Sequence, residues 1–198
     1  YIDGIISPPN FAMVKGKASH NVFEDYYKKV MEGKNRPKPK EIRDMSVEVL
    51  EEEVKNSDLK PEAKELDECK KEMEIASESY VSNIASNITP VGVEEEVRYE
   101  SRCGVEILAY LDLVHEKEDY VITDYKLTGK KWGLSNLQDS LQFKIYSLVT
   151  GLSEVEVHNI VKTTKTPKTF NKSPEEGVLD VTSNVRLLNH QFVQEEEL

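Results

Sequence analysis

The order of patterned segments predicts an α/β protein with a mixed central β-sheet flanked by helices. Apolar residues recur with the helical period from Phe11 to Val30 and through most of residues 41–86. From Ile88 the period changes to two, which is typical of strands, and a further helix and strand follow. Helices, three strands, a helix and another strand in this order indicate an α/β sandwich with a mixed sheet.

The helical first part of the sequence contains two breaks. Residues 33–39 contain one glycine, two prolines and three basic side chains, and this composition predicts a loop after the first helix. Residues 57–61 interrupt the second helical stretch, and Pro61 is suited to opening the next helix. We interpret residues 41–86 as an acidic helical insertion whose charged faces are solvated.

The strands are predicted from alternating or continuous apolar runs. Residues 105–114 and 120–127 are two β-rich runs joined by a polar turn at residues 115–119, so we expect an antiparallel hairpin. An alternating run precedes this hairpin at residues 91–99, and another occupies residues 155–163. Between the hairpin and the last strand, a helix is predicted from Ser135 or Asn136 to Thr150, ended by Gly151, with these residues facing inward: Leu137, Leu141, Ile145, Leu148 and Val149.

Length and composition predict one globular domain over residues 1–198. No apolar run approaches the roughly 18 residues that cross a bilayer, and the first residues lack a signal-peptide pattern. Cys69 and Cys103 have no CxxC spacing, which argues against an iron–sulfur cluster and favours a reducing compartment. We therefore expect a cytoplasmic protein with no membrane partner.

The net charge of −11 is unevenly distributed. Residues 41–100 hold 18 acidic and 7 basic side chains, whereas residues 15–40 and 126–172 each hold 8 basic and 3 acidic ones. The two basic stretches could steer a phosphate backbone toward a cleft, or they could merely solvate the surface. Charge alone does not decide between these readings.

The predicted hairpin carries an aspartate inside each apolar run. A turn centred near Glu118 would set Asp112 opposite Asp124, and side chains in opposite positions are about 5 Å apart at Cβ. Lys126 lies two residues after Asp124 and therefore projects from the same face of its strand. Burying two carboxylates is costly unless a cation or hydrogen bonds compensate for it.

Two carboxylates and an ammonium group at one point suit phosphoryl transfer. Mg²⁺ held by one or two carboxylates polarises a phosphate oxygen and lowers the pKa of a bound water. Lys126 could hold or deprotonate the attacking water and offset the charge of the transition state. In the alternative reading, Asp112 and Asp124 are strand-edge carboxylates and Lys126 is their surface partner; the hairpin context favours the nuclease.

Four short motifs resemble the RecB-like branch of the PD-(D/E)xK nuclease superfamily. They are a G-x-x-x-H helix at residues 16–20, an aspartate-bearing strand at Leu111-Asp112, the D-x-K strand at 124–126 and a Q-x-x-x-Y helix at 142–146. The segment from Pro90 to Glu94 is also similar to that family. The resemblance covers roughly residues 12–165 and implies a restriction-endonuclease-like core.

The resemblance implies a role for each motif residue. His20, Asp112, Asp124 and the carbonyl of Tyr125 would hold Mg²⁺ or Mn²⁺, and Lys126 would be the catalytic lysine. Gln142 and Tyr146, one helical turn apart, would face the site as catalytic residues that contact DNA or orient the lysine. Without the resemblance, His20 would be read as a core histidine and the other two as a half-buried helix face.

Nucleic-acid contacts are expected from basic and aromatic residues near this centre. Trp132 could stack on a base, although a packing role is equally compatible with the sequence. The basic residues that we expect at the nucleic acid are Lys130, Lys131, Lys144, Lys162 and Lys165.

Together these observations predict a Mg²⁺- or Mn²⁺-dependent DNA exonuclease of stand-alone type, as phages and viruses encode. The alternatives are a nuclease-fold protein that binds DNA or a partner without cutting, an endonuclease, or a ribonuclease of the same fold. No G-x-x-x-x-G-K-[ST] loop occurs, so a motor would have to come from a protein partner in recombination or replication.

Overall fold

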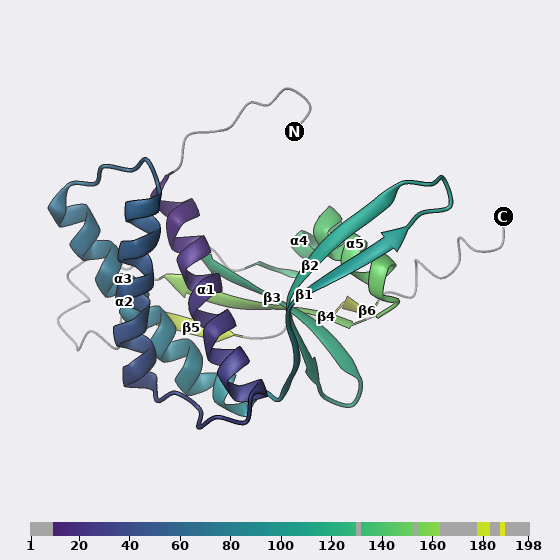
Figure 1. Cartoon of the computed structure of the whole chain (residues 1–198), viewed down its shortest axis with the longest axis horizontal. Helices are drawn as coiled ribbons and strands as arrows, with labels where there is room; N and C mark the ends of the chain where they lie inside the picture. The colour runs from purple at the N-terminus through teal and green to yellow at the C-terminus, as the bar shows by residue number, and fades with distance from the viewer. Residues whose placement is uncertain (1–9, 130–131, 153, 163–177, 183–186, 189–198) are drawn as a thin grey trace.

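A computed structural model describes residues 10–129, 132–152, 154–162, 178–182 and 187–188 (Figure 1). Three long helices come first, followed by three consecutive strands, two short helices and three further strands. The elements in chain order are α1 (Phe11–Met31), α2 (Pro39–Asn56), α3 (Ala63–Asn83), η1 (Ala85–Asn87), β1 (Pro90–Glu100), β2 (Glu106–Glu116), β3 (Tyr120–Thr128), α4 (Leu134–Asp139), α5 (Leu141–Thr150), β4 (Glu154–Lys162), β5 (Val178–Thr182) and β6 (Leu187–Leu188).

The described strands form one mixed sheet in the order β1-β2-β3-β4-β5, with β6 also paired to β4. Strands β1, β2 and β3 are antiparallel neighbours, and β3 and β4 are parallel. The parallel pair is connected through α4 and α5, as a crossover between parallel strands requires. The predicted mixed sheet flanked by helices is confirmed.

Helices cover the two faces of the sheet (Figure 1). Helices α1 to α3 pack on one face, where Phe23 and Tyr80 meet Leu113 and Tyr125 in a buried cluster. Helix α5 packs on the other face through a second cluster that includes Phe143. Because side chains alternate along a strand, β3 sends Tyr125 toward α1 and α3, and its neighbours Asp124 and Lys126 toward α5.

The helices within residues 41–86 contribute to the core. Ile42 of α2 and Tyr80 of α3 are fully buried beside Tyr125. Leu50 and Met73 pack against α1 in a third cluster. The predicted break between these helices is confirmed, because α2 ends at Asn56 and α3 begins at Ala63.

The predicted helix at residues 135–150 is interrupted. Ser140 has an extended backbone (φ −71°, ψ 120°) and separates α4 from α5. The inward orientation predicted for Leu141 and Leu148 is wrong, because these side chains are 69% and 44% exposed. The buried face of α5 carries Phe143 and Tyr146 instead of the predicted Leu141 and Leu148. With the helix in this orientation, Gln142 points toward Asp124 of β3.

The polar turn after the second strand is shorter than predicted. His115 and Glu116 belong to β2, and His115 is buried rather than part of a turn. The turn is confined to residues 117–119, closed by a hydrogen bond from Lys117 N to the carbonyl of Asp119.

None of the helices in the described part of the chain combines the length and apolar character needed to cross a bilayer.

Candidate metal centre

The β2–β3 hairpin brings two aspartates together. Its ladder pairs His115 with Val121 and Leu113 with Thr123, and the same register continued by one residue sets Asp112 opposite Asp124. The ladder stops at Leu113. Beyond it, Asp112 Oδ2 accepts a hydrogen bond from the backbone N–H of Tyr125 at 3.1 Å.

Helix α1 adds an imidazole to the aspartates. His20 Nδ1 lies 3.3 Å from Asp112 Oδ2, and His20 Nε2 lies 3.1 Å from the carbonyl oxygen of Tyr125. Burial lowers the pKa of His20, but the hydrogen bond with Asp112 and the charges of Asp112 and Asp124 outweigh it, so the pKa is raised. The ring is thus placed between the carbonyl and carboxylate oxygens.

Glu94 is a further carboxylate at this point that the sequence prediction missed. One ligand atom each from His20, Glu94 and Asp112 lies within 4.8 Å of the others. Glu94 has a positive φ of 52° next to the irregularity between Pro90 and Gly92 in β1. Burial and the nearby charge of Asp112 raise the pKa of Glu94. The only sequence signal was its place in the segment from Pro90 to Glu94.

Asp124 is buried and held by two side chains. Its Oδ2 lies 2.7 Å from Lys126 Nζ, and its Oδ1 accepts a hydrogen bond from Gln142 Nε2 at 2.8 Å. Burial and the charge of Asp112 raise the pKa of Asp124 to about 6, against the opposing effect of Lys126. Lys126 is therefore the charged neighbour of this buried oxygen, Oδ2.

Gln142 and Tyr146 complete the α5 side of the centre. Gln142 Nε2 also reaches Tyr146 Oη at 2.8 Å, and its Oε1 lies 3.4 Å from Lys126 Nζ. Burial raises the pKa of Tyr146 well above its ordinary value, so the phenol stays protonated at neutral pH. The predicted residues therefore form two sets of contacts. His20, Asp112 and Tyr125 form one, and Asp124, Lys126, Gln142 and Tyr146 form the other. The two sets adjoin where Asp124 precedes Tyr125 in β3.

Of the residues predicted to bind nucleic acid, Trp132, Lys144 and Lys162 belong to the described part of the chain. The Trp132 ring packs edge-on against Phe143 at 6.1 Å between centroids, and Lys126 Nζ lies 5.3 Å from the Trp132 ring centre. Trp132 thus packs against α5 next to Lys126, and its stacking on a base stays a prediction. Lys144 is half-buried on α5, and Lys162 ends β4. Lys130, Lys131 and Lys165 lie outside the described residues.

A comparison with protein families decides the family. The sequence model of the PD-(D/E)XK nuclease superfamily matches residues 1–177, most of the chain.

The chain belongs to the PD-(D/E)XK nuclease superfamily. A search of the curated proteins found no significant match. The mixed sheet with flanking helices is the restriction-endonuclease-like α/β core of this superfamily, whose members are metal-dependent nucleases.

The residues at the centre fit a divalent metal. His20, Glu94 and Asp112 offer one nitrogen and two carboxylate oxygens within 4.8 Å of one another, and the Tyr125 carbonyl lies beside His20. Asp124, which is outside that set of three, supplies a further carboxylate from β3. The buried Asp124 Oδ2 is already paired with the Lys126 ammonium at 2.7 Å, so a divalent cation on this oxygen would bind beside that charge. This donor set matches the oxygen-rich sites of Mg²⁺ and Mn²⁺.

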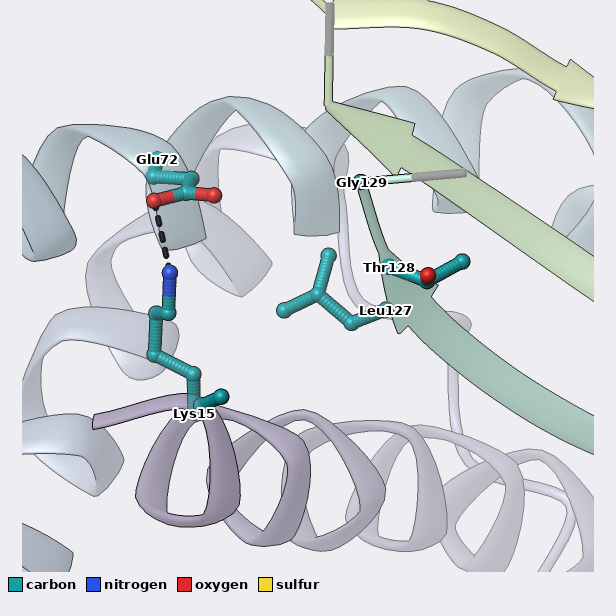
Figure 2. Close-up of a pocket in the computed structure, with 6 residues that line it drawn as sticks. Lys15, Glu72, Leu127, Thr128 and Gly129 are labelled. Atoms are coloured by element: carbon teal, nitrogen blue, oxygen red, sulfur yellow. Dashed lines mark hydrogen bonds and ion pairs between the residues drawn. The ribbon is translucent and has the colours of Figure 1, made fainter. Parts of the chain in front are cut away.

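A cavity of about 270 Å³ beyond the end of β3 is separate from this centre (Figure 2). It is lined by Leu127, Thr128 and Gly129, and the ion pair between Lys15 and Glu72 (2.8 Å) joins α1 to α3 across it. Leu127 packs toward the α1–α3 helices and Lys126 toward α5, so the cavity and Lys126 lie on opposite sides of β3.

Proposed function

We propose that this member of the PD-(D/E)XK superfamily is a Mg²⁺- or Mn²⁺-dependent exonuclease of the RecB-like branch that degrades DNA. Its proposed catalytic residues are Asp112, Asp124 and Lys126, assisted by Gln142 and Tyr146. Its proposed metal ligands are His20, Asp112, Asp124 and the Tyr125 carbonyl, to which the structure adds Glu94 as a candidate.

The observation that carries this proposal is the meeting of distant motifs at one point. His20 of α1 contacts both Asp112 and the Tyr125 carbonyl, which follow it by about 90 and 105 residues in the chain. Gln142 of α5 reaches Asp124 from the opposite side. Packing alone would not require a histidine, two aspartates, a lysine and a glutamine to share these contacts, because burying such groups is costly.

Each side chain has a chemical task in phosphodiester hydrolysis. A divalent cation bound by the carboxylates would polarise the scissile phosphate and acidify water. Lys126 lies between Asp124 Oδ2 and Gln142 Oε1, so its ammonium group is held where it can orient the attacking water and offset negative charge on phosphorus. Gln142 fixes both Asp124 and Lys126.

The identity of the metal follows from the donors. Carboxylate and carbonyl oxygens suit both Mg²⁺ and Mn²⁺, and the imidazole of His20 adds a nitrogen that Mn²⁺ accepts more readily than Mg²⁺. We therefore expect both ions to support cleavage, with Mn²⁺ effective at lower concentration.

Cleavage of labelled DNA tests the proposal. Purified protein is incubated with end-labelled linear DNA, a covalently closed circle and a labelled RNA, each with Mg²⁺, Mn²⁺ or EDTA. Asp124→Asn is compared with Asp44→Asn, an exposed aspartate of α2. We expect metal-dependent loss of the linear DNA alone, absent in Asp124→Asn and normal in Asp44→Asn.

Other outcomes contradict the proposal in distinct ways. Cutting of the circle indicates an endonuclease, and degradation of RNA alone indicates a ribonuclease. DNA binding without cleavage under either metal indicates a non-catalytic member of the superfamily. Cleavage retained by Asp124→Asn means that the catalytic centre lies elsewhere.

A further inference from the structure

A second cluster of ionisable side chains lies on the face of the sheet that packs against α3. His115 of β2 and Glu156 and His158 of β4 are each about 1% exposed. Glu156 lies beside Thr123 and His158 beside Tyr125 in the β3–β4 register, on the face covered by α3. The cluster is therefore separate from Asp124 and Lys126, which face α5.

The distances inside the cluster are too long for direct hydrogen bonds. Glu156 Oε2 lies 3.8 Å from His115 Nε2 and 3.6 Å from His158 Nε2. One ligand atom from each residue lies within 4.8 Å of the others. Two ligand atoms bound to the same tetrahedral Zn²⁺ at usual bond lengths are about 3.3 Å apart, so small side-chain shifts would close the set around an ion.

Glu156 Oε2 is a buried carboxylate oxygen without a hydrogen bond. The other oxygen, Oε1, is paired with Lys117, whose side chain is 36% exposed. Leaving a buried carboxylate oxygen unsatisfied is costly, which makes such an atom a sign of a missing cation or proton donor. Oε2 faces both imidazoles, so a cation would sit among the three side chains.

Partners outside the cluster orient one of the imidazoles. His158 Nδ1 is hydrogen-bonded to Tyr80 Oη at 2.8 Å, and Tyr80 Oη is hydrogen-bonded to Tyr27 Oη at 2.9 Å. This arrangement leaves Nε2 of His158 toward Glu156, and metal-binding histidines usually hydrogen-bond through their other nitrogen in this way.

His115 has a competing contact that metal binding would replace. Its Nε2 lies 3.0 Å from the hydroxyl oxygen of Thr123. The hydroxyl group can rotate, and a metal–nitrogen bond would be stronger than this hydrogen bond. Access is available, because a cavity of about 260 Å³ is bounded by the cluster, Lys117 and residues at the end of α3.

We propose that His115, Glu156 and His158 bind Zn²⁺, and that this ion joins β2 to β4 and, through Tyr80, to α3. Two imidazoles and one carboxylate suit Zn²⁺ and leave a fourth position for water, whereas Mg²⁺ prefers an all-oxygen site. The role is structural, and it is independent of the exonuclease activity proposed for the other face.

Zinc binding is measured first in a background without the other centre. The His20→Gln/Asp112→Asn variant of the 198-residue chain is stripped with a chelator and dialysed. It is then titrated with Zn²⁺ in excess Mg²⁺, in competition with a chromogenic zinc chelator. We expect one equivalent of Zn²⁺ to bind and the melting temperature to rise. Co²⁺ in its place should give the strong visible absorption of a tetrahedral site with nitrogen ligands.

Substitutions of the proposed ligands then test whether the ion binds at this cluster. His115→Gln and His158→Gln in this background should each weaken zinc binding by about tenfold or more and remove the rise in melting temperature. Lys117→Met, which keeps the three ligands and removes a neighbouring positive charge, should tighten binding. Because Lys117 is partly exposed, that variant remains informative if a histidine variant fails to fold.

The proposal is overturned by any of three results. They are no zinc bound to the folded background protein, zinc affinity unchanged in folded His115→Gln and His158→Gln proteins, or zinc affinity unchanged in Lys117→Met. None of these results bears on DNA cleavage by the wild-type chain, so failure here is distinguishable from failure of the proposed nuclease function.

Discussion

Gln142 holds Asp124 through a hydrogen bond of 2.8 Å from Nε2 to Oδ1, while its Oε1 lies 3.4 Å from Lys126 Nζ. One amide thus fixes a proposed metal ligand and the proposed catalytic lysine. Removing it in Gln142→Ala should lower kcat for DNA cleavage by about 10- to 100-fold, because residues that orient metal ligands typically have effects of this size. Single-turnover kinetics at saturating Mn²⁺ measure the change.

The matched control is Gln138→Ala, an exposed glutamine on α4. We expect it to cleave DNA at the wild-type rate. Equal rates for Gln142→Ala and the wild-type protein would mean that Gln142 does not position the lysine during the reaction.

His20 and Glu94 are expected to act through metal affinity. Both approach Asp112 in the cluster of candidate ligands. His20→Ala and Glu94→Gln should each raise the Mn²⁺ concentration for half-maximal cleavage by about tenfold or more, since each removes a donor from the site. Glu95→Gln, an exposed neighbour, is the control and should leave the Mn²⁺ titration unchanged. An unchanged titration for Glu94→Gln would remove that residue from the site.

The hairpin that carries the site could be predicted because its signals are local. Two apolar runs separated by a polar turn define the strands, and the turn position defines the register that sets Asp112 opposite Asp124. Gly151 ends α5 in the left-handed conformation (φ 70°), which is also a local property that the sequence shows.

The missed features depend on contacts between distant segments. Glu94 is the first of three consecutive glutamates, so the sequence does not distinguish it from its neighbours. In β1 the alternation of buried and exposed residues is broken, because Gly92 and Val93 are buried and Glu94 is half-buried. This irregularity brings Glu94 toward His20. His115 was assigned to a turn because charged residues follow it, yet its environment is set by Glu156 on β4. The rotation of α5, which exposes Leu141, is likewise determined by packing of Phe143 on the sheet.

The α1–α3 layer is expected to determine stability rather than chemistry. Leu50 of α2 is fully buried against Val14, Ala18 and Met73. Leu50→Ala should lower the free energy of unfolding by about 2–5 kcal/mol, the usual cost of truncating a buried leucine. Urea titration followed by circular dichroism measures the loss, and DNA cleavage well below the melting temperature should persist. A loss under about 0.5 kcal/mol, typical of surface sites, would contradict the packing of this layer.

The pKa of Asp124 predicts how stability depends on pH in the absence of metal. Folding raises this pKa from 3.8 to about 6, so between these values the folded chain holds a proton that the unfolded chain has released. The contribution of Asp124 to stability must therefore decrease as pH rises from about 4 to about 6 and stay constant above that.

In EDTA, the melting temperature of the wild-type protein should fall between pH 4 and pH 6 relative to that of Asp124→Asn, whose amide side chain cannot ionise. Excess Mn²⁺ should reverse the trend, because metal binding requires the ionised carboxylate and stabilises the folded chain. A difference between the two proteins that is flat from pH 4 to pH 6 in EDTA would show that burial and Asp112 do not raise the pKa of Asp124.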